Sequence, residues 1–185
     1  MNIVLHEPEI PFNTGAIGRT CVATGTVLHL IRPYGFLLND RNLKRAGMDY
    51  WEKLRLFEYR DYTDFRRQHS ELCLGSHAKM CTEDDAPRLW FATTKARQIY
   101  SEVCFGMDDY IMFGKESAGI PEEILAEHPE SCIRIPMYGD IRSLNLSNSV
   151  SVLLYEALRQ NNFGGLRREG ALHRLHWREG NAHGT

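Results

Sequence analysis

Residues 132–160 read CIRIPMYGDIRSLNLSNSVSVLLYEALRQ, and three patterns follow one another within this stretch. A short β-rich run at 132–135 predicts a strand, and residues 147–160 predict a helix. The helix carries one apolar stripe, made of Val150, Leu153, Leu154, Ala157 and Leu158. A polar loop lies between the two elements.

That loop holds more polar side chains than a turn needs. Its polar and charged residues within nine positions are Asp140, Arg142, Ser143, Asn145, Ser147 and Asn148. One of them can cap the helix N-terminus, but a single cap needs only one such side chain. The excess of hydrogen-bonding groups indicates a functional site at this loop.

The alternation of short apolar runs and helical patterns extends through the rest of the chain. Further strands are predicted at 2–6, 27–31, 54–59, 88–93 and 109–113. Helices are predicted at 14–24, 38–46 and 62–73, and another begins at Pro121, where proline and two following glutamates suit a helix N-terminus. Residues 75–87 are predicted to form a polar surface loop. This order predicts an α/β fold, a single domain with a mostly parallel sheet flanked by helices.

Length and composition fit one soluble globular domain, with 185 residues of which 43% are hydrophobic and 25% charged. Gly164 and Gly165 break the last helix, so we expect a domain at 1–162 and a basic C-terminal extension at 163–185. From residue 159 onwards, five arginines stand against two glutamates, although the net charge of the chain is −2. A local basic segment can bind phosphates whatever the total charge. We expect the extension to be mobile or to dock on RNA or on a partner.

Cysteine usage and the N-terminus bear on the cellular compartment. The five cysteines are odd in number and contain no C-x-x-C pair, which predicts reduced thiols. Cys73, His77 and Cys81 are spaced for one helix face, but a fourth ligand is missing nearby, so no metal is expected. The first strand begins at Asn2, which leaves no room for a signal peptide, and no run is long enough to span a membrane. These features predict a cytoplasmic protein without membrane contact.

Two more segments place polar and glycine residues directly after predicted strands, where open α/β sheets build their sites. In residues 7–19, EPEIPFNTGAIGR, Asn13 can cap the next helix and Arg19 lies within it. In FGKESAGIPEEIL, Gly114 and Glu116 belong to a tight loop whose backbone amides can face a ligand. Each segment alone also fits an ordinary strand–turn–helix connection. The absence of P-loop, G-x-G-x-x-G and G-x-S-x-G motifs disfavours P-loop kinases, dehydrogenases and α/β-hydrolases.

Together these segments resemble the SPOUT superfamily of RNA methyltransferases, and most of all its bacterial tRNA 2′-O-methyltransferases that modify cytidine or uridine 34. The motifs match in order and spacing at 2–19, 45–51 (RAGMDYW), 113–121 and 133–160. The resemblance implies a C-terminal deep trefoil knot, S-adenosylmethionine (AdoMet) as methyl donor, and a homodimer formed through the first and last helices. It also implies the tRNA anticodon stem-loop as partner. The alternatives are 2′-O-methylation of another tRNA or rRNA position, and an RNA-binding protein that keeps the knot without catalysis.

The resemblance further implies roles for single residues. The implied cofactor pocket consists of Thr93, Gly114, Ile135, Ser143 and Leu144. The implied catalytic set consists of Arg19, Asn13, Glu116, Ser143 and Asn145. A guanidinium keeps its proton, so Arg19 is expected to anchor phosphate and stabilise charge, with a general-base role left open. Asn13 is expected to hold the loop or the ribose, and Glu116 to position Arg19 or a neighbouring loop. Tyr155 is expected to contact the tRNA or to lie in the dimer interface.

Overall fold

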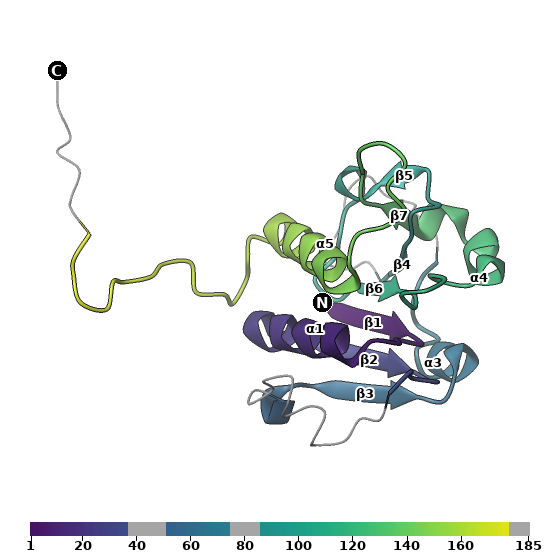
Figure 1. Cartoon of the computed structure of the whole chain (residues 1–185), viewed down its shortest axis with the longest axis horizontal. Coiled ribbons are helices and arrows are strands. Elements are labelled where there is room, and N and C mark those ends of the chain that lie inside the picture. The colour runs from purple at the N-terminus through teal and green to yellow at the C-terminus, as the bar shows by residue number, and fades with distance from the viewer. Residues whose placement is uncertain (37–50, 75–85, 178–185) are drawn as a thin grey trace.

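A parallel sheet with helices on both faces forms the body of the protein (Figure 1). The structure is a computed structural model that describes residues 1–36, 51–74 and 86–177. Within these ranges the sheet has seven strands in the order β3-β2-β1-β6-β4-β7-β5, and its paired strands run parallel. The strands are β1 (Asn2–His6), β2 (Val27–Ile31), β3 (Leu56–Tyr59), β4 (Leu89–Ala92), β5 (Gln98–Ile99), β6 (Tyr110–Phe113) and β7 (Cys132–Arg134). The predicted α/β class with a parallel sheet is confirmed.

The helices form one layer on each face of the sheet. The α-helices are α1 (Pro11–Thr24), α3 (Tyr62–Gln68), α4 (Glu122–Glu127) and α5 (Leu146–Gln160). Short 3-10 helices lie at η1 (Trp51–Lys53), η2 (Tyr100–Glu102) and η3 (Pro129–Ser131). Helices α1 and α5 pack against each other on one face, and α3 and α4 cover the other.

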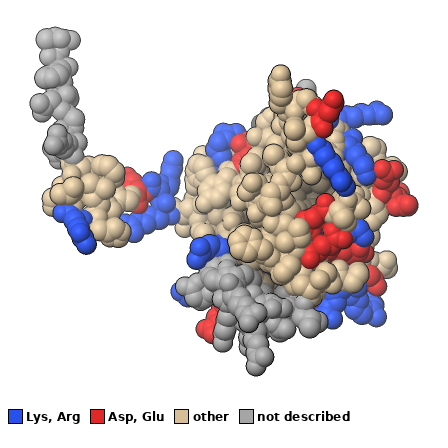
Figure 2. Space-filling model, in the orientation of Figure 1, with Lys and Arg blue, Asp and Glu red and all other residues tan. Residues whose placement is uncertain are grey.

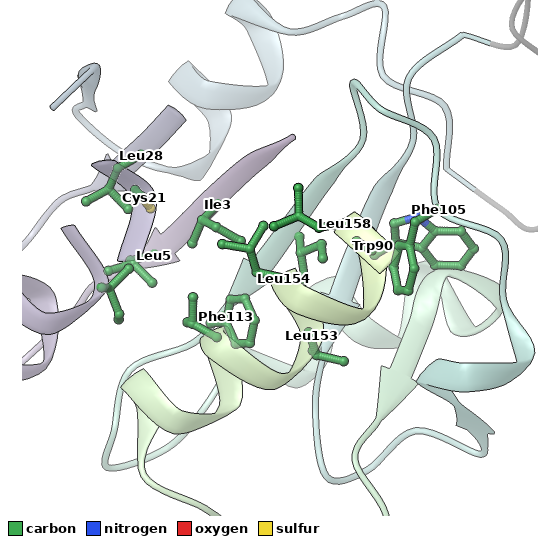
Figure 3. Close-up of a cluster of buried hydrophobic side chains, with 14 of the residues drawn as sticks. Ile3, Leu5, Cys21, Leu28, Trp90, Phe105, Phe113, Leu153, Leu154 and Leu158 are labelled. Carbon is green, nitrogen blue, oxygen red and sulfur yellow. The ribbon is translucent and has the colours of Figure 1, made fainter. Parts of the chain in front are cut away.

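The sheet divides the core into two clusters, because successive side chains of a strand point to opposite faces. Ile3 and Leu5 of β1 belong to the cluster under α1 and α5, whereas Val4 belongs to the cluster under α3 and α4. The apolar stripe predicted for the last helix is buried throughout, and Figure 3 shows Leu153 and Leu154 against the sheet. This packing fixes the start of α5 beside the start of α1.

The first helix begins earlier than predicted. It starts at Pro11 and not at residue 14, because proline suits the first turn, where its missing N–H group has no partner to lose. The N–H groups of Asn13 and Thr14 both bond to the carbonyl of Ile10. Asn13 therefore lies inside the first turn rather than at the cap.

The helix predicted at 62–73 is wrong at its end, since α3 stops at Gln68. The guanidinium of Arg66 donates to the carbonyl oxygens of His69 and Leu72, which satisfies backbone groups beyond the helix in a turn. Cys73 then forms a parallel bridge with Arg88. The chain at Cys73 is therefore strand-like, where the last turn of a helix was predicted.

Other predicted elements agree with the structure within a residue or two, and the helix expected at Pro121 is α4, with Pro121 as its N-cap. The two-residue strand β5 was not predicted. The helix predicted at 38–46 lies outside the described residues, as do most of the loop at 75–87 and most of the RAGMDYW motif.

One cysteine differs from the expectation of reduced thiols. Cys104 is disulfide-bonded, whereas Cys21, Cys73 and Cys132 are free. The prediction is wrong for Cys104 because spacing along the sequence does not show which thiols the fold brings within bonding distance.

The possible metal ligands and membrane segments can be assessed for the described residues. There, no group of three or more His, Cys, Asp and Glu side chains is placed to hold a metal ion. His77 and Cys81, two of the three residues considered as ligands, lie outside those residues. No helix in the described ranges has the length and apolar character needed to cross a membrane.

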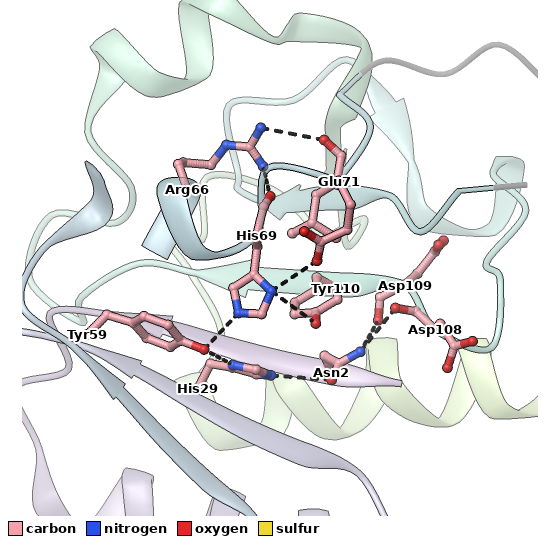
Figure 4. A network of polar contacts seen from close by, with 10 residues as sticks. Asn2, His29, Tyr59, Arg66, His69, Glu71, Asp108, Asp109 and Tyr110 are labelled. Carbon is pink, nitrogen blue, oxygen red and sulfur yellow. Dashed lines mark hydrogen bonds and ion pairs between the residues drawn. The ribbon is translucent and has the colours of Figure 1, made fainter. Parts of the chain in front are cut away.

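A chain of polar side chains, buried at Asn2, His29 and Tyr59, ties the first three strands together (Figure 4). The Nδ1 of His29 is 2.8 Å from the hydroxyl of Tyr59, and its Nε2 is 3.3 Å from Oδ1 of Asn2. The Tyr59 hydroxyl is also 2.8 Å from Nε2 of His69, whose Nδ1 is 3.2 Å from Oε1 of Glu71. Burial, reinforced by His69, lowers the pKa of His29 to about 3. His29 is therefore a neutral core residue at physiological pH.

Candidate active site

A cavity of about 630 Å³ lies at the carboxyl edge of the sheet, beyond β4, β6 and β7. Parallel strands end at the same edge, so loops that are distant in the sequence meet there. The cavity is lined by the loops after these strands, the beginning of α1 and the loop before α5. The predicted site residues that line it are Asn13, Thr93, Gly114, Glu116, Ile135, Ser143, Leu144 and Asn145.

Glu116 holds the loop after β6 against the entrance to α1. Its Oε2 accepts the N–H of Glu9 at 2.8 Å, and its Oε1 accepts the N–H of Ile10 at 3.3 Å and Nδ2 of Asn13 at 2.9 Å. A carboxylate that accepts several N–H bonds is held in one orientation. Glu116 therefore positions a neighbouring loop, one of the two roles expected for it.

Asn13 and Asn145 join the two helix starts. The Oδ1 of Asn13 accepts a hydrogen bond of 3.0 Å from Nδ2 of Asn145. The Oδ1 of Asn145 in turn accepts from the N–H of Ser147 at 2.9 Å and the N–H of Asn148 at 3.4 Å, so it is the N-cap of α5. The oxygen and the NH2 group of each side-chain amide both form hydrogen bonds. A continuous series of hydrogen bonds therefore links Glu116, Asn13 and Asn145 along the cavity wall.

Further contacts also hold the loop after β6 against the loop after β1. The carboxylate of Glu9 accepts the N–H and the hydroxyl of Ser117, each at 2.8 Å, and these bonds lower the pKa of Glu9. Lys115 Nζ lies 2.9 Å from Oε2 of Glu7, and the hydrogen bond to this carboxylate, together with its charge, raises the pKa of the lysine. The loops after β1 and β6 thus form one body, which keeps the cavity wall preorganised.

Gly114 is the position where backbone passes closest to backbone. A Cβ atom there would lie 2.0 Å from the carbonyl carbon of Gly119 and 2.1 Å from the nitrogen of Ile120. Gly119 itself has φ +75°, a conformation that favours glycine. Only glycine at 114 lets the loop fold back over the strand end and leave its backbone facing the cavity.

The cavity combines apolar walls with few charges. Phe113, Ile133, Ile135 and Leu153 contribute apolar surface, which suits a flat ring or an aliphatic chain. Three cationic residues that were not predicted as site residues, Lys95, Lys115 and Arg142, also line the cavity. Lys95 pairs with Glu122 at 2.8 Å, and Arg142 donates to the carbonyl of Ser117 at 2.6 Å. No sequence signal singled out Lys95, whereas Arg142 stood within the polar loop.

Arg19 and Tyr155 do not line the cavity of their own chain. Arg19 is exposed on α1, and the side chain of Tyr155 is 48% exposed on α5. Phe12 and Val152 are exposed on the same two helices. The two helices that pack together on the sheet therefore present an outer surface with both apolar and cationic groups.

Comparison with known proteins agrees with this architecture. Residues 1–155 match the model of the SpoU rRNA Methylase family. A putative tRNA (cytidine(34)-2′-O)-methyltransferase of Listeria monocytogenes is 43% identical, with 91% of this chain and 92% of the relative covered. The tRNA (cytidine(34)-2′-O)-methyltransferase of Escherichia coli is 45% identical, with 89% and 96% covered.

Solved structures show the same fold. A structure that gave insights into the 2-OH methylation of C/U34 on tRNA superimposes with a TM-score of 0.74 at 40% identity. The match covers 87% of this chain and 95% of that one. The body of the chain, including the cavity loops, thus has counterparts along nearly the whole length of such proteins.

Proposed function

The chain belongs to the SpoU rRNA Methylase family, and from this premise we propose that it transfers a methyl group from AdoMet to the ribose 2′-hydroxyl of the tRNA wobble nucleotide, cytidine or uridine 34. Relatives that align with this chain over most of both lengths are named for this activity. The observation that supports the proposal best is the preorganised cavity, whose wall is the bonded series Glu116, Asn13 and Asn145.

The cavity has the properties that AdoMet binding requires. Its volume of about 630 Å³ lies in the usual range for small-molecule sites. Backbone at Gly114, Ile135 and Leu144 would hold the adenine and ribose, while Thr93 and Ser143 would add hydroxyl groups. AdoMet supplies an electrophilic sulfonium methyl, so the chain has mainly to align the reactants. The fixed loops are suited to that task because they need no rearrangement around the ligand.

The reaction also requires that the ribose hydroxyl be positioned and that the charge developing on its oxygen be stabilised. We assign this role to Arg19. A guanidinium stays protonated, so it anchors the phosphate beside the reacting nucleotide and stabilises the charge that develops on the oxygen. Asn13 and Asn145 hold the starts of α1 and α5 together at the site, and Ser143 completes the set of polar residues there.

The homodimer belongs to the same proposal, because Arg19 lies outside the cavity of its own chain. The exposed side chains of Phe12, Val152 and Tyr155 make the outer surface of α1 and α5 suitable for contact with a second copy. In such a dimer Arg19 would lie at the interface, beside the partner. Tyr155 would then serve either the interface or the bound anticodon stem-loop.

A knotted C-terminal part is also proposed. After β7 the chain passes Arg142, which donates to the loop at Ser117, and reaches Asn13 through Asn145 before α5 begins. These contacts support a knot in which the C-terminal part of the chain threads through a loop. The proposed domain spans 1–162, the extension spans 163–185, and the proposed location is the cytoplasm.

The experiment for this function is to incubate the purified chain with labelled AdoMet and bulk tRNA, or with ribosomal RNA in a parallel reaction. A 2′-O-methyl group protects the adjoining phosphodiester from alkali, so label in alkali-resistant dinucleotides from tRNA supports the proposal. Label on bases, or in rRNA alone, would contradict it. The latter result would favour the alternative of another RNA position, which the family's rRNA members make the second candidate.

A further inference from the structure

The segment after α5 is anchored at its base and exposed beyond it. Phe163 and Leu166 pack against the core cluster, and the N–H of Phe163 bonds to the carbonyl of Leu158 at 2.8 Å. Residues 167–177, which we call the arm, then extend away from the body (Figure 1). The arm lies beyond residues 1–155 that match the family model.

The arm is basic and carries exposed apolar side chains. Arg167, Arg168 and Arg174 stand against one acidic residue, Glu169, and Figure 2 shows basic side chains along this segment. The side chain of Trp177 is 68% exposed, and its Nε1 donates to the carbonyl of Gly170 at 3.3 Å. This bond bends the arm into a loop that leaves the indole face open.

Guanidinium groups next to an open indole face are the chemistry that binds RNA. Arginine forms bidentate bonds with phosphate, and an aromatic face stacks on an unpaired base. We propose that the arm binds the tRNA backbone and stacks Trp177 on an unpaired base, at a place other than the target nucleotide. The inference rests on the proposed function, since it takes tRNA as the substrate.

The position of the arm separates its role from catalysis. Helix α5 has its N-cap beside the cavity and is 15 residues long, so its last residue, Gln160, lies about 22 Å from Asn145 along the helix axis, and the arm follows beyond that end. At that distance it contacts RNA outside the reacting nucleotide. The arm is therefore expected to increase tRNA affinity and to leave the chemical step unchanged.

The test compares tRNA binding by the full chain and by two arm variants. The first replaces Arg167, Arg168 and Arg174 with alanine, and the second is Trp177→Ala. Fluorescence anisotropy with labelled bulk tRNA at several salt concentrations gives Kd and its salt dependence without any methyl transfer. We expect the triple variant to bind about tenfold more weakly and its log–log salt slope to shrink by about 2, because each phosphate contact contributes about 0.7–0.9.

Matched variants distinguish an effect of the arm's position and side-chain chemistry on tRNA binding from an effect of net charge alone. Alanine at Arg32, Arg60 and Arg67 removes the same charge from the opposite part of the body, where these arginines pair with Glu58 and Asp64. This control is expected to retain the salt slope, and lysine at the three arm positions is expected to restore most of it. Trp177→Phe should bind more tightly than Trp177→Ala because it keeps an aromatic face.

Kinetics with saturating AdoMet complete the test. The arm variants should show a raised KM for tRNA, an unchanged kcat and an unchanged AdoMet affinity by calorimetry. An unchanged tRNA Kd and salt slope in the triple variant, with normal methyl transfer, would overturn the arm inference alone. A change of mass in size-exclusion chromatography with tRNA binding unchanged would overturn it in favour of a protein contact. Absence of methyl transfer by the unaltered chain would instead contradict the proposed function.

Discussion

Asn145 donates a hydrogen bond of 3.0 Å to Asn13 across 132 positions of sequence, while its own oxygen caps the helix that follows it. One amide thus performs two separable tasks. The oxygen stabilises α5, whereas the NH2 group connects α5 to α1 and, through Asn13, to Glu116.

Two substitutions at Asn145 separate these tasks. Asn145→Asp keeps an acceptor for the cap but replaces the donor to Asn13, so stability should change little while methyl transfer falls. Asn145→Ala removes both, and the free energy of unfolding should fall by about 1 kcal/mol, the usual effect of losing an N-cap. Urea unfolding and the rate of methyl transfer measure the two effects. Equal activity of Asn145→Asp and the unaltered chain would show that the link to Asn13 has no part in the reaction.

Gly114 offers a test of the cofactor site. In Gly114→Ala the new Cβ would lie 2.0 Å from the carbonyl carbon of Gly119, so the loop must move and AdoMet affinity should fall by at least tenfold. Gly164→Ala is the matched control, because its new Cβ would meet its nearest neighbour at an ordinary 3.6 Å. Calorimetric titration with AdoMet gives both affinities. An unaltered affinity in Gly114→Ala would place the cofactor elsewhere.

Arg19 is expected to act on the RNA and not on the cofactor. Arg19→Ala should lower the rate of methyl transfer by about 10²-fold, as loss of one stabilising donor does at many active sites. Its AdoMet affinity should be unchanged, since Arg19 does not line the cavity. Arg67→Ala removes an exposed arginine from α3, on the other face, and should retain full activity. Retention of the full rate by Arg19→Ala would remove Arg19 from the mechanism.

The sequence was informative about the cavity because its loops carry dense local patterns. The strand ends near Thr93, Gly114 and Ile135 follow from apolar runs, whereas the expectation that these residues line a cofactor pocket came from the family resemblance. What could not be predicted is how the loops bond, since Glu116 meets Asn13 across 103 positions and no periodicity encodes such a contact. Lys95 was missed for the same reason.

Errors at element ends have local physical causes. Pro11 begins α1 because the first turn tolerates a missing N–H, a signal that was present but assigned to the preceding loop. The end of α3 depends on the Arg66 side chain bonding to carbonyls after the helix, which helical patterning does not reveal. The two-residue β5 is too short to show alternation.

The buried His29 makes stability depend on pH. Its pKa is about 3 in the folded chain and 6.5 in the unfolded one, so between these values the unfolded state binds more protons. Its contribution is therefore complete above pH 6.5 and is lost as the pH falls toward 3. The free energy of unfolding should fall by about 2 kcal/mol between pH 7 and pH 5 from this residue alone.

Urea unfolding of the unaltered chain and of His29→Gln at both pH values checks this expectation. The variant should show the smaller loss, with some dependence remaining because burial also lowers the pKa of His6. An equal loss in both proteins would show that His29 does not carry the effect.

The most direct test of the proposed activity is to map the nucleotide that receives the methyl group. A tRNA with cytidine 34 is incubated with the chain and labelled AdoMet, digested with nucleases that leave identifiable fragments, and analysed by mass spectrometry. We expect a single 2′-O-methyl group on the ribose of nucleotide 34. A methyl group on a base, or on the ribose of any other nucleotide with position 34 unmodified, would contradict it.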